Sequence, residues 1–171
     1  MLFTKSAIGA TLICLTALPG TTTIGADAPR STPAAATATK PILTLAEAQR
    51  VLDAGRAMAQ SLDAGGAIAV VDDGGYLLAL SRPEDTFPAA AEVATAKART
   101  AATFHKSTED FENAIKGGRT SLVAVGPMTP LEGGVPIVID GRVVGAVGVS
   151  GAHSSTEDVQ IARAAAAAGA P

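Results

Sequence analysis

The feature that most constrains the fold is the dipeptide Asp140-Gly141, which separates two apolar runs at residues 135–139 and 142–149. An Asp-Gly pair between such runs favours a tight turn with positive φ angles, and this turn joins neighbouring antiparallel strands. The chain is therefore expected to build its sheet from hairpins. An alternation of single strands and helices, as in a doubly wound parallel sheet, does not fit this pattern.

A second hairpin and four helices are predicted around this turn. Residues 67–71 and 76–80 are short apolar runs joined by a turn, which predicts another pair of antiparallel strands. Residues 120–125 fit either a strand or a helix. The first and last helices begin at capping boxes, in which a Thr or Ser caps the helix and a Glu three residues later reaches back. The predicted helices span residues 44–62, 88–106, 107–117 and 154–168.

This order of elements predicts an α+β domain. Its sheet would be antiparallel, with about five strands, and flanked by helices. The chain is rich in alanine and glycine, and only 3% of its residues are aromatic. Small side chains let helices approach a sheet closely, so the composition agrees with tight helix–sheet packing.

Lys97 interrupts the apolar stripe of the helix predicted over residues 88–106. At about 100° per residue, Val93, Phe104 and several alanines share one face, with Lys97 in its middle and His105 at its edge. An inward-facing lysine is costly unless a partner meets its charge. We expect the amine to line a pocket and pair with an anionic ligand group, or to form an ion pair with an internal carboxylate such as Asp72. The alternative is a side chain that reaches solvent along the stripe.

The first segment has the layout of a secretory signal peptide over residues 1–26, with Lys5 before a mostly apolar stretch and small residues after it. Residues 27–41, rich in Ala, Thr and Pro, are interpreted as a flexible linker, and residues 42–171 as one domain. The expected location is therefore periplasmic or secreted. The apolar stretch is too short for a membrane-spanning helix, so no span is expected in the mature chain.

Composition argues against several kinds of site and partner. The single cysteine, Cys14, lies in the signal segment, so the mature chain would have no disulfide and no cysteine-ligated metal. The formal net charge of −3 becomes −4 once Lys5 is removed, and no basic patch favours nucleic acid. Nucleophile elbows, phosphate loops and zinc spacings are absent, so no catalytic or metal-binding residue is assigned.

Two glycine-containing segments are further candidates for a site. In residues 148–155 a predicted strand runs through Ser150, Gly151 and His153 into a helix start, where free backbone N–H groups can receive an anion. Acidic residues already occupy the first turn of that helix, so a plain capped helix is the alternative. Glu132 precedes a glycine pair and is either a pocket carboxylate or a solvated loop charge.

Four blocks of sequence together resemble the GlcG/HbpS family, and the similarity runs from about residue 42 to 168. The blocks are residues 69–75, 94–101, 133–136 and 145–151. The resemblance implies a profilin-like α–β–α fold and assembly into homo-oligomers. Several members bind haem or related tetrapyrroles, and some are exported partners of extracytoplasmic sensor proteins. Lys97 matches the lysine of the family's Lys-Ala block.

Because the mature chain would lack cysteine, haem iron would be held by histidine, tyrosine or methionine. His105 is the favoured ligand, with a helix-capping role as its alternative. Tyr76, Met58 and Met128 are the other candidates. The predicted cofactor-binding residues are Lys97, His105, Glu132, Ser150, Gly151 and His153.

Three functions are therefore weighed. The first is an exported, non-enzymatic protein that binds haem or a similar small anionic cofactor as a homo-oligomer. The second is an enzyme of lyase or isomerase type that acts on a small carboxylate, with Lys97 as base or electrophile and Glu132 or Asp72 as its partner. The third is an accessory subunit whose glycine-rich faces pack against copies of itself or against a sensor protein.

Overall fold

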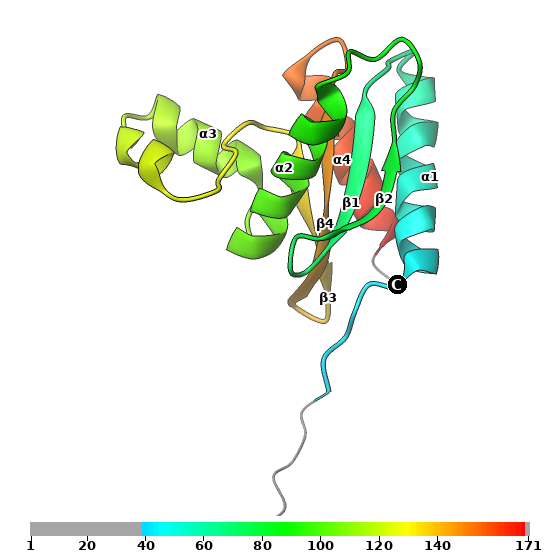
Figure 1. Cartoon of the computed structure of the whole chain (residues 1–171), viewed down its shortest axis with the longest axis horizontal. Coiled ribbons are helices and arrows are strands. Elements are labelled where there is room, and N and C mark those ends of the chain that lie inside the picture. Colours follow the sequence, from blue (N-terminus) through cyan, green and yellow to red (C-terminus); the bar gives the residue numbers. More distant parts are fainter. Residues whose placement is uncertain (1–38, 170–171) are drawn as a thin grey trace, which may run out of the picture. The chain divides into compact units, whose positions relative to one another are not determined.

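The computed structural model describes residues 39–169, so the predicted signal peptide and most of the predicted linker lie outside the described residues. Helices and strands follow one another in the predicted order, and both hairpins are confirmed (Figure 1). The bounds are α1 Leu45–Ser61, β1 Ala67–Asp72, β2 Leu77–Ser81, α2 Ala90–Phe104, α3 Thr108–Lys116, η1 Thr120–Ala124, β3 Gly134–Ile139, β4 Arg142–Ser150 and α4 Ser155–Ala168.

The sheet of the described chain has four strands in the order β2-β1-β4-β3, and all neighbours are antiparallel. The two hairpins meet along β1 and β4, where Ile68 lies opposite Val149. The expectation of about five strands is wrong for residues 39–169. The undecided segment forms the 3-10 helix η1, which packs against α3 instead of extending the sheet.

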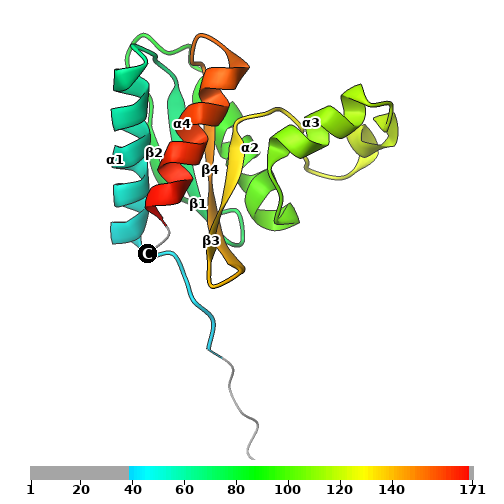
Figure 2. The same ribbon diagram turned by 180° about the vertical axis from the view of Figure 1, so that it is seen from behind.

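Helices cover both faces of the sheet, which confirms the expected α+β class with α–β–α layering. α1 and α4 lie side by side on one face, while α2 covers β4, β1 and β3 on the other (Figures 1 and 2). α3 and η1 extend away from the sheet beyond α2 (Figure 1). The helices α2 and α4 therefore lie on opposite sides of the strand β4.

Local sequence explains where the helices begin. Thr44 Oγ1 accepts a hydrogen bond from the N–H of Glu47, whose carboxylate accepts one from Thr44 N–H, so the first capping box is complete. Ser154 caps α4 in the same way, but the carboxylate of Glu157 accepts from the N–H of His153 rather than from the cap. Each cap contributes about 0.5–2 kcal/mol to stability.

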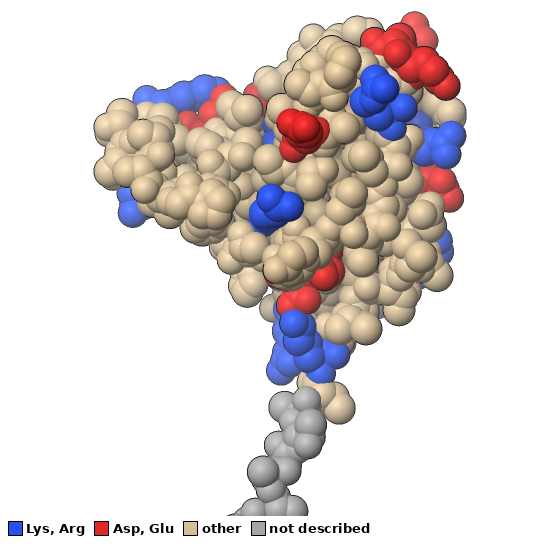
Figure 3. All heavy atoms as spheres, viewed as in Figure 1, with Lys and Arg blue, Asp and Glu red and all other residues tan. Residues whose placement is uncertain are grey.

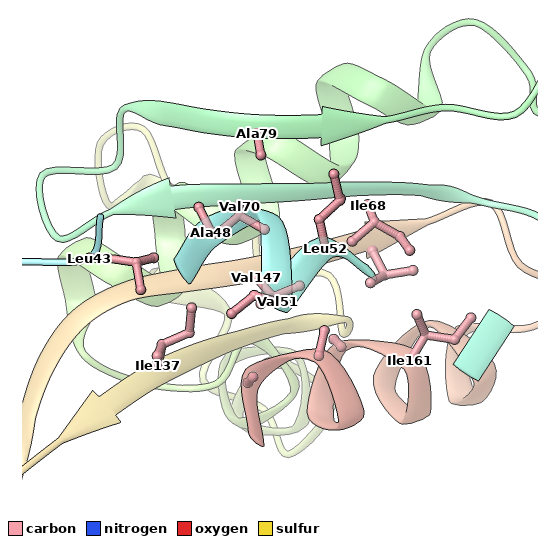
Figure 4. Close-up of a cluster of buried hydrophobic side chains, with 14 of the residues drawn as sticks. Leu43, Ala48, Val51, Leu52, Ile68, Val70, Ala79, Ile137, Val147 and Ile161 are labelled. Atoms are coloured by element: carbon pink, nitrogen blue, oxygen red, sulfur yellow. The ribbon is translucent and has the colours of Figure 1, made fainter. Parts of the chain in front are cut away.

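The main core lies between the sheet and the layer formed by α1 and α4. Figure 4 shows Val51 of α1, Ile68 of β1, Ile137 of β3 and Ile161 of α4 pointing into this space. All four are at most 2% exposed. Burying a side chain of this size contributes about 1.5–3 kcal/mol, so this layer supplies much of the hydrophobic stabilisation.

The opposite face is packed by small residues. A Cβ at Gly148 of β4 would overlap the carbonyl of Ala94 and lie 2.6 Å from the backbone nitrogen of Ala98, both in α2. The backbone of α2 therefore rests almost directly on that of β4. Four alanines of α2 are fully buried against this face of the sheet: Ala90, Ala94, Ala98 and Ala101.

The long helix is shorter than predicted at both ends. It ends where His105 adopts the left-handed conformation, with φ of 54°. Phe104 was expected in the buried stripe but is 39% exposed, and its ring makes a T-shaped contact with Phe111 of α3 at 5.6 Å between centroids. The aromatic pair helps to hold α3 against the end of α2.

Candidate functional site

Lys97 is buried at the centre of α2, as its place in the apolar stripe predicts. The residue is 4% exposed, which excludes the alternative in which the amine reaches solvent. Its Nζ donates to the carbonyl oxygen of Val149 at 2.8 Å and to Oδ2 of Asp158 at 3.0 Å. The N–H of Val149 donates to the carbonyl oxygen of Gly133, the residue just before β3. The Lys97 amine thus donates to the carbonyl of Val149 where the β3–β4 pairing ends.

The carboxylate that meets Lys97 belongs to Asp158 in the first turn of α4, not to Asp72. Asp72 instead accepts from the N–H of Tyr76 in the β1–β2 turn. Asp158 is 6% exposed, and its other oxygen accepts from the N–H of Ala152 at 3.1 Å. Burial raises the pKa of Asp158, and the charge and hydrogen bond of Lys97 offset only part of that rise.

The ion pair ties the helix on one face of the sheet to a helix on the other. Two glycines make room for it at the start of β3. A Cβ at Gly133, which has φ of 111°, would lie 3.1 Å from Lys97 Nζ and 2.8 Å from Val149 O. A Cβ at Gly134 would lie 2.6 Å from the carbonyl oxygen of Lys97. Close packing therefore requires glycine at both positions of this pair, which opens the block at residues 133–136.

Glu132 is half-buried next to these glycines, and its N–H donates to Glu112 Oε2 at 2.6 Å. Oε1 of Glu112 also forms an ion pair with Nζ of Lys116 at 2.8 Å. Burial opposes ionisation of Glu112, but the hydrogen bonds from Lys116 and Glu132, with the charges of Lys116 and Lys97, together lower its pKa. The charge of Glu132 also raises the pKa of Asp158, which places Glu132 in the electrostatic surroundings of the buried pair.

In the segment after β4, the polar groups form hydrogen bonds with one another. Ser150 is 6% exposed at the end of the strand, and Gly151 has φ of 96° beside Phe87. His153 is exposed, and its Nδ1 lies 3.2 Å from Glu157 Oε2. Side chains of Ser154, Glu157 and Asp158 accept the N–H groups at the start of α4. The alternative of a plain capped helix accounts for these contacts.

His105 lies apart from the other predicted site residues. It is eight residues beyond Lys97, about 12 Å along the axis of α2. There it lines a hollow of about 570 Å³ together with Pro41, Val138, Val143 and Arg142. Lys40 and Asp73 complete the rim and form an ion pair with each other. The volume falls within the range of about 300–1,000 Å³ that small-molecule pockets occupy.

The six predicted residues therefore divide between two places. Lys97, Glu132, Ser150, Gly151 and His153 surround the ion pair and the start of α4, whereas His105 faces the β3–β4 turn. Sequence reasoning missed Arg142 and the valines of the hollow, although they flank the hairpin turn that it identified. It noted Asp158 only for its place in a helix start. Within residues 39–169, no group of three or more His, Cys, Asp or Glu could hold a metal ion.

None of the helices within residues 39–169 has the length and apolar character needed to cross a bilayer. The three layers, the close packing of α2 on β4 at Gly148 and the buried ion pair of Lys97 together define a small α–β–α domain. The chain belongs to the HbpS-like family, described as haem degrading protein HbpS-like, which matches residues 43–167.

Individual relatives agree with this assignment. Protein GlcG of Escherichia coli K12 is 48% identical over 112 residues, which cover 66% of this chain and 84% of GlcG. A crystal structure of a doubly substituted HbpS from Streptomyces reticuli superposes with a TM-score of 0.72 at 30% identity, covering 83% of this chain and 97% of that one. A crystal structure of a PduOC–heme complex has a TM-score of 0.67 at 26% identity, covering 75% and 95% respectively.

Proposed function

We propose that this protein is an exported, non-enzymatic binding protein for haem or a closely related tetrapyrrole, and that it works as a homo-oligomer. The observation that carries the proposal is the hollow beside the β3–β4 turn, where an imidazole, apolar side chains and cations meet. The family description and the heme complex of a structural relative support a haem-related ligand.

The residues of the hollow suit the chemistry of haem. His105 would hold the haem iron through an imidazole nitrogen, as histidine does in many haem proteins. Pro41, Val138 and Val143 would offer apolar contacts to the porphyrin, and the side chain of Val138 is 43% exposed. Arg142 makes no ion pair within residues 39–169 and would pair with a propionate. Bound haem supplies redox and ligand-exchange chemistry at its iron.

Export and partnership rest on sequence. The signal-like residues 1–26 support a periplasmic or secreted location, and the family resemblance supports a homo-oligomer and an extracytoplasmic sensor protein as partner. The enzyme alternative needs a free Lys97 amine. That amine is buried and held by Asp158 and Val149, so the structure offers no observation that favours this alternative.

A hemin titration of the purified protein, followed by its Soret band, tests the proposal. We expect a shifted Soret band for the wild type and a loss of affinity of about tenfold or more in His105→Asn. Asparagine tolerates the left-handed backbone at this position, so the substitution removes the imidazole without straining the helix end. His153→Asn is the matched control, because it removes the other exposed histidine, and it should bind hemin like the wild type.

The proposal is wrong if the wild type gives no shifted band. It is also wrong in its choice of site if His105→Asn and His153→Asn retain hemin equally well. A complementary observation is the visible absorption spectrum of the protein purified from the envelope of its own host, which should contain a Soret band.

A further inference from the structure

The outward face of α2 carries features that its packing on the sheet does not use. Residues Glu92, Thr95, Ala96 and Arg99 line a shallow hollow of about 290 Å³ with Leu80 of the edge strand β2. Leu80 is 41% exposed and adds apolar surface to this face. Figure 3 shows that the surface over α2 and β2 is largely uncharged and that the few charges on it are isolated.

The threonine hydroxyls of this face already have acceptors for their donors. Thr95 Oγ1 donates to Ala91 O at 2.8 Å, and Thr103 Oγ1 donates to Arg99 O at 2.8 Å. Both hydroxyls are thus hydrogen-bonded to the backbone one turn earlier. A partner could cover them without leaving an unsatisfied hydroxyl donor, so the face is suited to burial.

The two charges of the face are placed symmetrically. Glu92 and Arg99 are seven residues apart, so they lie on one side of the helix, about 10.5 Å apart along its axis. The point midway between them falls between Thr95 and Ala96. Within residues 39–169 neither side chain forms an ion pair; Arg99 donates only through Nε, to Gly75 O at 3.2 Å.

We infer that this face pairs with the same face of a second copy of the chain, with the two α2 helices antiparallel about a two-fold axis between Thr95 and Ala96. In such an isologous contact Glu92 of each copy meets Arg99 of the other, so one pair of residues forms two ion pairs. The small Thr95 and Ala96 at the centre let the helices approach. Leu80 of each copy is covered at the rim.

This inference goes beyond the proposed function, which names a homo-oligomer but no surface, and it does not depend on the ligand bound near His105. The hollow beside the β3–β4 turn and the outward face of α2 share no lining residue. A failure of hemin binding would leave this interface untouched, and a failure of the interface would leave the hemin result untouched.

Charge reversal tests the reciprocal geometry. Glu92→Arg brings two guanidinium groups together at both ends of the contact, and Arg99→Glu brings two carboxylates together there. In sedimentation velocity, each single variant should dissociate to a smaller species at protein concentrations about tenfold or more above those needed for the wild type. The double variant Glu92→Arg/Arg99→Glu should recover the wild-type mass, which also shows that losing the contact with Gly75 is not the cause.

An equimolar mixture of the two single variants should also recover the wild-type species, because one copy then carries two arginines and the other two glutamates. Glu84→Arg and Arg119→Glu reverse exposed charges on other surfaces and serve as controls. Circular dichroism of each variant checks that it is folded. A monomeric wild type overturns the inference. So do single variants that sediment like the wild type, or a double variant that stays as dissociated as the single ones.

Discussion

Removing one partner of the Lys97–Asp158 pair should destabilise the domain far more than removing a surface ion pair. In Asp158→Leu the ammonium group of Lys97, which is 4% exposed in the wild type, keeps Val149 O as its one remaining partner of the two that the structure shows. In Lys97→Met the carboxylate keeps only the N–H of Ala152, and Val149 O loses its donor. Breaking a buried pair from one side costs about 3–5 kcal/mol.

The double variant Lys97→Met/Asp158→Leu should be less destabilised than either single variant. It leaves no buried charge, and its main penalty is the unpartnered carbonyl of Val149, about 1–3 kcal/mol. The matched control is Arg163→Met. Arg163 pairs with Glu109 at 2.6 Å, but its side chain is 62% exposed, and surface pairs contribute about 0–1 kcal/mol.

Urea denaturation at pH 7, followed by far-ultraviolet circular dichroism, gives the free energy of unfolding of all five proteins. A domain of ordinary stability, about 5–15 kcal/mol, tolerates the expected losses and stays folded without denaturant. The reasoning would be refuted by single variants no less stable than Arg163→Met. It would equally be refuted if the effects of the two substitutions simply added in the double variant, since the pair would then have no coupling energy.

Two further results are expected. Gly148→Ala should lower the free energy of unfolding by about 3 kcal/mol or more in thermal or urea denaturation, because its Cβ would overlap the backbone of α2. Gly141→Asn should be nearly neutral, since a Cβ there meets nothing within 4 Å and asparagine tolerates the φ of 73°. Equal effects of the two substitutions would contradict the close approach of α2. The pKa of Glu112 is lowered in the folded protein, so the stability that its carboxylate contributes is present above the ordinary pKa of 4.5 and is lost as pH falls through the lower folded value. In urea titrations the difference in unfolding free energy between wild type and Glu112→Gln should therefore shrink as the pH falls below 4.5. A difference that grows on acidification would contradict the lowered pKa.

Much of the local structure could be predicted because the signals lie within a few residues of one another. The Asp140-Gly141 turn, the Thr44 cap and the apolar stripe around Lys97 each depend on neighbours one or two turns away. The segment Thr120–Ala124 could not be decided, because its short apolar run suits a strand or a helix equally and only its contact with α3 selects between them.

The candidate site was less accessible to sequence reasoning. Lys97 could be identified as an interior cation, since Val93, Ala94 and Ala101, three or four residues away, are apolar. Its partner could not, because Asp158 lies 61 residues further along the chain and looked like an ordinary acidic residue in a first helical turn. His105 and His153 could be grouped as possible ligands, but the structure places only His105 in a hollow with Arg142 and the valines.

Local patterns along the chain specify the four α-helices, the two hairpins, their order and the need for a partner inside α2. The pairing of β1 with β4 follows from no local pattern, since it joins residues about 80 positions apart and its closure depends on the whole core. This pairing brings Val149 and the start of α4 next to Lys97. Long-range strand pairing, which no local pattern encodes, is therefore the physical reason that Asp158 and not Asp72 meets the buried amine.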